Sequence, residues 1–244
     1  MNANSALKAG KEGFVFTIFS IILTFVLGYF VSKLLKIEKK TSFLISGGTA
    51  ICGGSAIAAI APAIKAEEKQ ISVALGTIFI LNSIALFVFP FVGHLVNLDA
   101  SQFGLWCAIA IHDTSSVVGA AAKFGPEALE VATTVKLARA LWIIPISLLS
   151  IVLFKSKESK VKIPYFIGLF VLAMLANSYI PMVSQFSSYI TTIAKIGLTI
   201  TLFLIGTGLS MKVISSVGIK PLLLGIILWI CISATSLWVI LSMY

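Results

Sequence analysis

Four ionisable side chains occur inside long apolar stretches of this chain, where a charge is costly. His112 and Asp113 are adjacent in AIAIHDTSSVVGAAAKFGP, while Lys136 and Arg139, the single arginine, are three residues apart in VATTVKLARALWIIP. An ionisable group in mid-bilayer costs at least about 2.5–3.5 kcal/mol on insertion scales, so such groups predict function. The His112–Asp113 pair offers an imidazole that changes charge near neutral pH and a carboxylate that could bind Na⁺ or fix the orientation of the imidazole. The alternative is a hydrated pair near a helix end, satisfied locally.

Lys136 and Arg139 share one face of a helix, which predicts an anion site. The arginine guanidinium presents a planar fork of donors that matches carboxylate or sulfonate-like oxyanions. The amino-terminal ends of half-helices would direct further donors to the same place. The alternative is an ion pair within the membrane, with Asp113 or Glu130, that serves assembly.

Two stretches rich in small residues, 43–64 and 103–122, are candidates for broken helices. The first contains SGGTAICGGSAIAAIAPAI, and glycine costs about 1 kcal/mol relative to alanine in a helix interior, so its paired glycines mark where a helix can open. Close helix packing is the alternative use of small residues. Cys52 has no local His or Asp and is expected to be a small residue rather than a nucleophile. The candidate solute-binding residues of the two stretches are Thr49, Cys52, Gly53, Gly54, Ser55, His112, Thr114, Ser115 and Ser116.

The composition places these residues in a membrane. Of the 244 residues, 59% are hydrophobic and 11% charged, whereas a soluble domain carries roughly a quarter charged residues. The apolar segments reach the length of about 20 residues that a helix needs to cross a bilayer, and backbone satisfaction within lipid requires them to be helical. Eight such segments can be marked, at 13–35, 43–64, 71–95, 103–122, 129–154, 164–180, 190–209 and 221–243.

The small-residue segments also introduce two similar units. GGSAIAAIAPAI precedes EEKQ and a helix ending in Phe89-Pro90, and SSVVGAAAKFGP precedes EALE and a helix ending in Ile144-Pro145. Corresponding broken segments in two repeats indicate the binding site of a transporter.

Basic residues predict the orientation of the units. Lysines cluster in the loops at 33–40 and 155–162 and at Lys212 and Lys220, which are expected to be cytoplasmic. If both small-residue segments dip in and return, these loops share one side, and the loop at 97–102, which lacks Lys and Arg, lies opposite. The two units then enter from opposite faces, as in an inverted repeat, although Lys8 and Lys11 fall outside.

Three of these stretches carry a resemblance to a known family. GGTAICGGSAIAAIAPAI, FGLWCAIAIHDTSSVVGAAAKFG and VATTVKLARALWIIP resemble the YeiH-type family of bacterial inner-membrane proteins, whose members carry the label sulfate exporter. The resemblance covers essentially the whole chain and implies secondary transport by a broken-helix, inverted-repeat fold. Family members usually begin with additional membrane segments, so the chain, in which the similar stretch starts at Ala6, is expected to be shortened by about two helices.

These observations predict one all-α integral membrane domain, 1–244, that crosses the bacterial inner membrane several times. Its expected function is secondary transport of a small anion, sulfate or organosulfonate-like, by alternating access. The expected partners are that anion and the lipid bilayer. The sequence is also compatible with a homo-oligomer. The chain has no HExxH, CxxC, Walker or GxSxG motif, so no enzyme activity, metal, cofactor or nucleic acid is expected. The alternatives are an antiporter that couples Na⁺ or H⁺ through His112 and Asp113, and a shortened, transport-inactive subunit.

Overall fold

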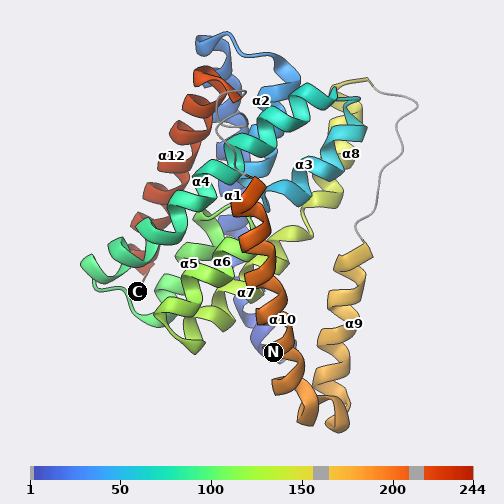
Figure 1. Cartoon of the computed structure of the whole chain (residues 1–244), viewed down its shortest axis with the longest axis vertical. Coiled ribbons are helices and arrows are strands. Elements are labelled where there is room, and N and C mark those ends of the chain that lie inside the picture. The colour runs from blue at the N-terminus through green and yellow to red at the C-terminus, as the bar shows by residue number, and fades with distance from the viewer. Residues whose placement is uncertain (1–2, 156–164, 209–216, 244) are drawn as a thin grey trace.

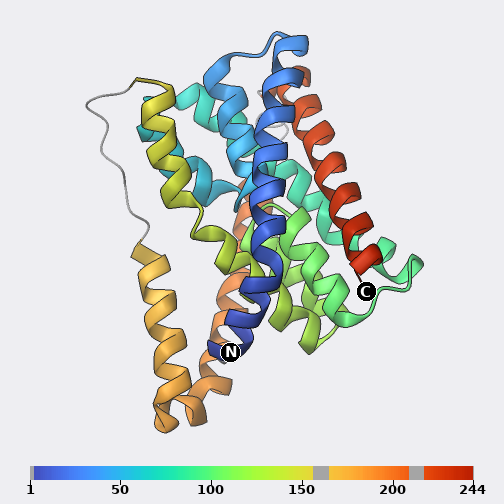
Figure 2. The same ribbon diagram turned by 180° about the vertical axis from the view of Figure 1, so that it is seen from behind.

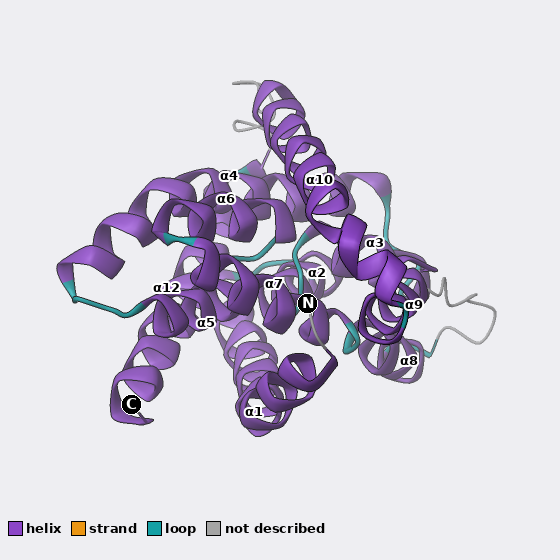
Figure 3. Cartoon of the chain, turned by 90° about the horizontal axis from the view of Figure 1, so that it is seen from below, coloured by secondary structure: helices purple, strands orange, loops and turns teal. Residues whose placement is uncertain are grey.

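The computed structural model describes residues 3–155, 165–208 and 217–243, which form helices joined by short turns (Figure 1). Figure 3 shows helices and loops, and no strand, within these ranges. The helices are α1 (Ala3–Leu35), α2 (Lys39–Ala50), α3 (Gly54–Ala63), α4 (Glu68–Leu95), α5 (Ala100–Ala110), α6 (Thr114–Phe124), α7 (Pro126–Ala140), α8 (Ile143–Leu153), α9 (Tyr165–Tyr179), α10 (Pro181–Gly208) and α12 (Ile219–Met243).

The described part of the chain contains apolar helices of membrane-spanning length, as the sequence predicted. Four stretches there are long and apolar enough to span a membrane, at Phe16–Leu35, Glu68–Leu95, Pro126–Leu153 and Ile219–Ser242. Many large apolar side chains, such as Phe30 and Phe87, face outward. Such an exterior suits lipid, because a soluble protein rarely exposes large contiguous apolar patches.

Both small-residue segments are broken helices, as the sequence predicted. Three residues, Ile51 to Gly53, separate α2 from α3, and Gly53 has a φ of 64°, a left-handed conformation that favours glycine. Three residues, Ile111 to Asp113, separate α5 from α6 in the second segment. No glycine occurs in this second break, and extended backbone at Ile111 and Asp113 turns the chain instead.

The two broken segments enter from opposite ends of the molecule. In Figure 1, α2 descends from the upper end, α3 returns toward it, and α4 then runs down to the left side of the lower half, where α5 begins. The pair α5 and α6 lies in the lower half, and α7 with α8 returns upward, an arrangement that Figure 2 shows from behind. The stretches that follow the two broken segments, Glu68–Leu95 and Pro126–Leu153, are each 28 residues long. This is the inverted repeat that the sequence predicted.

The basic ends of the helices gather at one end of the molecule. The carboxyl ends of α1 and α8 and the amino end of α12, which carry Lys33, Lys155 and Lys220, all lie at the upper end (Figure 1), while α5 begins toward the other end. This distribution matches the predicted side for the basic loops. Lys157, Lys160, Lys162 and Lys212 lie outside the described residues.

The fifth predicted segment, 129–154, is divided into two helices a few residues before Ile144-Pro145, where the sequence predicted that the helix of the second unit ends. It forms the carboxyl-terminal part of α7 and all of α8, separated by a turn at Leu141 and Trp142. Pro145 has no N–H group to donate to the carbonyl of Leu141, four residues earlier, so a regular helix is interrupted there.

The close packing of α5 on α7 generates a stability prediction. A methyl group at Gly104 would lie 2.5 Å from the carbonyl oxygen of Ala128, which is backbone and cannot rotate away, whereas one at Gly197 in α10 meets nothing within 4 Å. We expect Gly104→Ala to destabilise the fold by about 1–3 kcal/mol through overpacking. Gly197→Ala should be neutral or slightly stabilising, because alanine favours helix. Thermal unfolding in detergent measures both, and equal melting temperatures would contradict the packing.

Candidate functional site

The two helix breaks meet in the middle of the molecule. A Cβ atom built on Gly53 would lie 3.3 Å from the carbonyl carbon of His112 and 3.3 Å from Cβ of Asp113. His112 is buried, and its backbone N–H donates to Oδ1 of Asn82 in α4 at 3.1 Å. The structure therefore brings the glycine-rich stretch and the His–Asp pair into direct contact, and we call this meeting point the crossing.

Lys136 caps the end of one half-helix. Its Nζ donates to the carbonyl oxygens of Ala108 at 3.3 Å and Ile111 at 2.5 Å, where α5 terminates. The last carbonyls of an α-helix lack partners within the helix and form the negative pole of its dipole. The buried ammonium group supplies both a donor and a compensating charge.

Arg139 plays the same role for the other half-helix. Its Nη2 donates to the carbonyl oxygen of Ala50, the last residue of α2, at 2.5 Å, and its Nη1 donates to Oγ of Ser20 in α1 at 3.1 Å. Lys136 and Arg139 are each only 1% exposed. One helix, α7, therefore supplies the cations that stabilise the carboxyl ends of both broken segments.

The alternative of an assembly ion pair with Asp113 or Glu130 does not match this geometry. Among the described residues, the hydrogen bonds of Lys136 and Arg139 go to backbone carbonyls and the hydroxyl of Ser20. Sequence reasoning missed this capping role. The small residues show that each segment breaks and so leaves carbonyl groups without partners. The sequence does not show which cation, far away along the chain, donates to those carbonyls.

The amino-terminal ends of the second half-helices differ in charge. Asp113 caps α6, because its Oδ1 accepts the backbone N–H of Ser116 at 2.9 Å and its Oδ2 accepts the Ser116 hydroxyl at 2.6 Å. At the same position in α3 stands Gly53, and no side chain caps that helix. The positive pole of α6 is thus paired with a carboxylate, while the positive pole of α3 is not.

Buried polar atoms without a partner gather around the crossing. Within the described part of the chain, no hydrogen bond reaches Oγ1 of Thr49, Nδ2 of Asn82, Nε of Arg139 or either ring nitrogen of His112. Buried polar groups are nearly always hydrogen-bonded, so each exception requires a reason such as water or a ligand. Their concentration beside two helix breaks indicates a place where a polar solute or water would be held.

The remaining predicted site residues divide between the interior and the surface. Cys52, Ser115 and Ser116 are buried, and the Cys52 thiol is free. Gly54 and Thr114, the first residues of α3 and α6, are half-buried, and Gly54 faces Leu75 and Phe79 of α4. Ser55 is exposed, so the structure does not place it inside the crossing. Asn82 of α4 contacts the second break directly through its bond with the His112 N–H.

Comparison with known proteins supplies a family. A family model described as "Conserved hypothetical protein 698" matches residues 1–225. A UPF0324 membrane protein of Bacteroides thetaiotaomicron is 56% identical over 239 residues, which cover 97% of this chain and 72% of the relative. UPF0324 membrane proteins of Photobacterium profundum and Geobacter sulfurreducens are 51% and 45% identical, over 99% and 97% of this chain and 74% and 76% of their own lengths. No solved structure matches the chain.

Two substitutions at Asp113 test whether its carboxylate caps α6. Asp113→Asn removes the charge but keeps an acceptor for the Ser116 N–H, whereas Asp113→Ala removes both. Because an alanine at a helix cap costs about 0.5–2 kcal/mol, we expect the alanine variant to unfold at a lower temperature than the asparagine variant. Equal melting temperatures of the two variants in the same detergent would show that the cap contributes nothing.

Proposed function

This chain belongs to the family of conserved hypothetical protein 698, the UPF0324 membrane proteins, and on that premise we propose that it is a secondary transporter for a small anion. The names of its relatives state a membrane location and no solute, so the proposal rests on the crossing. We place the protein in the bacterial cell membrane, which it would cross several times.

The charge at the crossing is the observation that carries the proposal. Lys136 and Arg139 contribute two positive charges, Asp113 contributes one negative charge, and all three side chains are at most 9% exposed. The half-helix dipoles do not remove the surplus, because two amino-terminal and two carboxyl-terminal poles meet there. An uncompensated charge in a dry interior is expensive, and a bound anion would neutralise it.

The position of the anion follows from which donors are unused. The amino-terminal end of α3 carries backbone N–H groups with no side-chain cap, and such an end binds anions. Arg139 Nε and the Thr49 hydroxyl lie around the preceding break without partners among the described residues. A tetrahedral oxyanion such as sulfate, or the sulfonate group of a small organic acid, presents enough oxygens to meet several of these donors at once.

Alternating access would follow from the inverted arrangement. The unit of α2 and α3 opens toward one end of the molecule and the unit of α5 and α6 toward the other (Figure 1). In transporters built from such repeats, one unit moves against the rest of the molecule around a fixed site. We propose that these two units move against α1 and α12, and that no covalent step or cofactor is involved.

Ligand-dependent stabilisation and flux test the anion site together. We expect sulfate or a small sulfonate to raise the melting temperature of the purified protein, since a solute at 100 times its Kd contributes about 2.7 kcal/mol by mass action. Arg139→Ala should lose this rise and abolish flux in proteoliposomes, while Lys123→Ala, which removes an exposed lysine, should keep both. A folded Arg139→Ala variant with normal flux would reject the anion site. If the folded wild-type protein bound no anion, the reading as a transport-inactive subunit would be favoured.

Ion coupling is a second candidate function, favoured by the state of His112. Its imidazole is buried, the residue precedes Asp113 in the second break, and both ring nitrogens lack partners in the described part of the chain. Such a group could exchange a proton, and Asp113 could instead hold Na⁺ if its bonds to Ser116 open.

Imposed gradients separate coupled from uncoupled transport. We expect a pH or sodium gradient to drive anion flux in proteoliposomes, and Asp113→Asn, which keeps the helix cap, to weaken that dependence more than it lowers exchange without a gradient. If the anion flux of the wild-type protein is unchanged by either gradient, ion coupling is excluded. That result would not contradict anion transport itself.

A further inference from the structure

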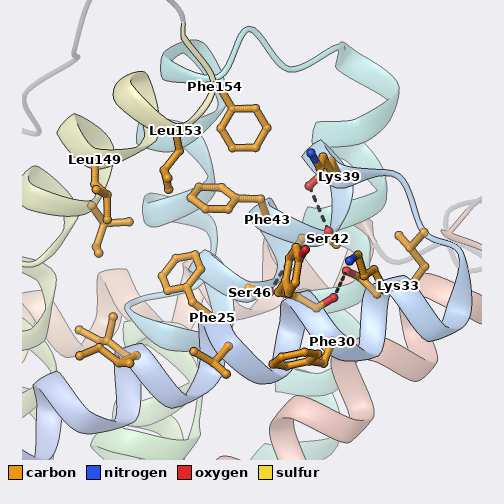
Figure 4. A pocket seen from close by; sticks show the side chains of 17 residues that line it. Phe25, Phe30, Lys33, Lys39, Ser42, Phe43, Ser46, Leu149, Leu153 and Phe154 are labelled. Carbon is orange, nitrogen blue, oxygen red and sulfur yellow. Dashed lines mark hydrogen bonds between the residues drawn. The ribbon is translucent and has the colours of Figure 1, made fainter.

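A second site lies away from the crossing, in a groove between α1, α2 and α8. The groove has a volume of about 570 Å³, within the range of small-molecule sites. Figure 4 shows its aromatic wall, where the rings of Phe25 and Phe43 are 5.0 Å apart and those of Phe43 and Phe154 are 5.1 Å apart. Phe30, Leu149 and Leu153 complete the labelled apolar lining and are 63%, 49% and 59% exposed, so the groove opens sideways toward lipid.

The polar groups of the groove are confined to one end. The hydroxyls of Ser32, Ser42 and Ser46 donate to carbonyls of their own helices, at 2.8–3.0 Å, so they offer little to an occupant. Lys33 and Lys39 line the groove and are exposed. Both lie where α1 ends and α2 begins, at the basic end of the molecule (Figures 1 and 4).

No acidic side chain in the described ranges neutralises these lysines. The Lys33 ammonium lies 4.9 Å from the centre of the Tyr29 ring and also hydrogen-bonds the Tyr29 side chain, contacts that bring it no negative counter-charge. Glu38 is the acidic residue of this turn, and its Oε1 accepts from Nε2 of Gln70 in α4 instead. Two ammonium groups at the mouth of this apolar groove therefore have no acidic partner in the part of the chain that the structure describes.

We propose that this groove binds one phospholipid with an anionic headgroup. The phosphate would lie against Lys33 and Lys39, and an acyl chain would pack on Phe25, Phe30 and Phe43. Basic pockets between membrane helices recognise anionic lipids in this way, because charge lies at the headgroup level and apolar surface below it. A helix from a second copy of the chain would fill the apolar part but would leave the two lysines without counter-charges.

The lipid would connect the fold to the candidate site. The walls of the groove include α2, whose carboxyl end is capped by Arg139, and α8, which follows α7, the helix that carries both capping cations. An occupied groove would therefore fix α2 against α8 at the end where α2 leaves the membrane.

Lipid binding by the whole protein tests the proposal. Native mass spectrometry would compare bound dioleoyl phosphatidylglycerol with dioleoyl phosphatidylcholine on the detergent-purified chain. Since each lysine contributes roughly fivefold to binding an anionic headgroup, two lysines predict a preference of about twenty-fivefold for phosphatidylglycerol. Lys33→Gln with Lys39→Gln should remove that preference, whereas Lys155→Gln with Lys220→Gln, at the same end but outside the groove, should retain it. Glycerol 3-phosphate, which has no acyl chains, should not compete.

Three results would overturn the proposal. The wild-type protein could bind both lipids equally, or the Lys33 and Lys39 double variant could keep its preference with an unchanged melting temperature. A third is disulfide-linked dimers from Phe30→Cys in phosphatidylglycerol nanodiscs, which would assign the groove to a second copy. None of these outcomes depends on anion transport, so the lipid site and the proposed function can fail separately.

Discussion

Four helix ends meet in the interior of this protein, and their unsatisfied backbone groups are the constraint on which the fold depends. A helix interrupted inside a membrane leaves carbonyl and N–H groups that lipid cannot satisfy. Here the carbonyls of Ala50, Ala108 and Ile111 are satisfied by Arg139 and Lys136 from a single neighbouring helix, α7. The cations are thus first a structural answer to broken helices. Any role in binding a solute must coexist with that answer.

The two repeats differ in how they treat the N–H groups at the amino-terminal ends of α3 and α6, and this asymmetry determines the charge at the crossing. In the second repeat Asp113 caps the positive pole of α6, whereas in the first repeat Gly53 leaves the pole of α3 uncapped. Glycine is required by its φ of 64° and by the 3.3 Å approach to His112 and Asp113, so a capping side chain has no room. The close contact between the two breaks therefore leaves the positive amino-terminal end of α3 without a side-chain cap.

The sequence predicted the helical membrane fold, both broken segments and their inverted orientation, because these follow from apolar length, glycine pairs and the placement of lysines. It placed the end of the second unit's helix at Ile144-Pro145, but it did not predict that the chain turns at Leu141 and Trp142 and begins a second helix, α8, that itself contains Pro145. For the site, the sequence identified the costly charges His112, Asp113, Lys136 and Arg139. Their partners could not be predicted, because a lysine bonded to a helix end and a lysine facing a solute have the same sequence signature.

Capping by one helix also couples the two breaks mechanically. Lys136 holds the end of α5 and Arg139, one turn later, holds the end of α2. If either unit moves relative to α7, one of these bonds must lengthen, and a buried carbonyl and a buried cation would lose their partners together, at a cost of about 1–3 kcal/mol for each unsatisfied group. An anion that accepts hydrogen bonds from the released cation would offset part of that cost. Under the proposed transport function, the same side chains would resist movement of the two units in the absence of solute, and that movement would depend on a bound anion.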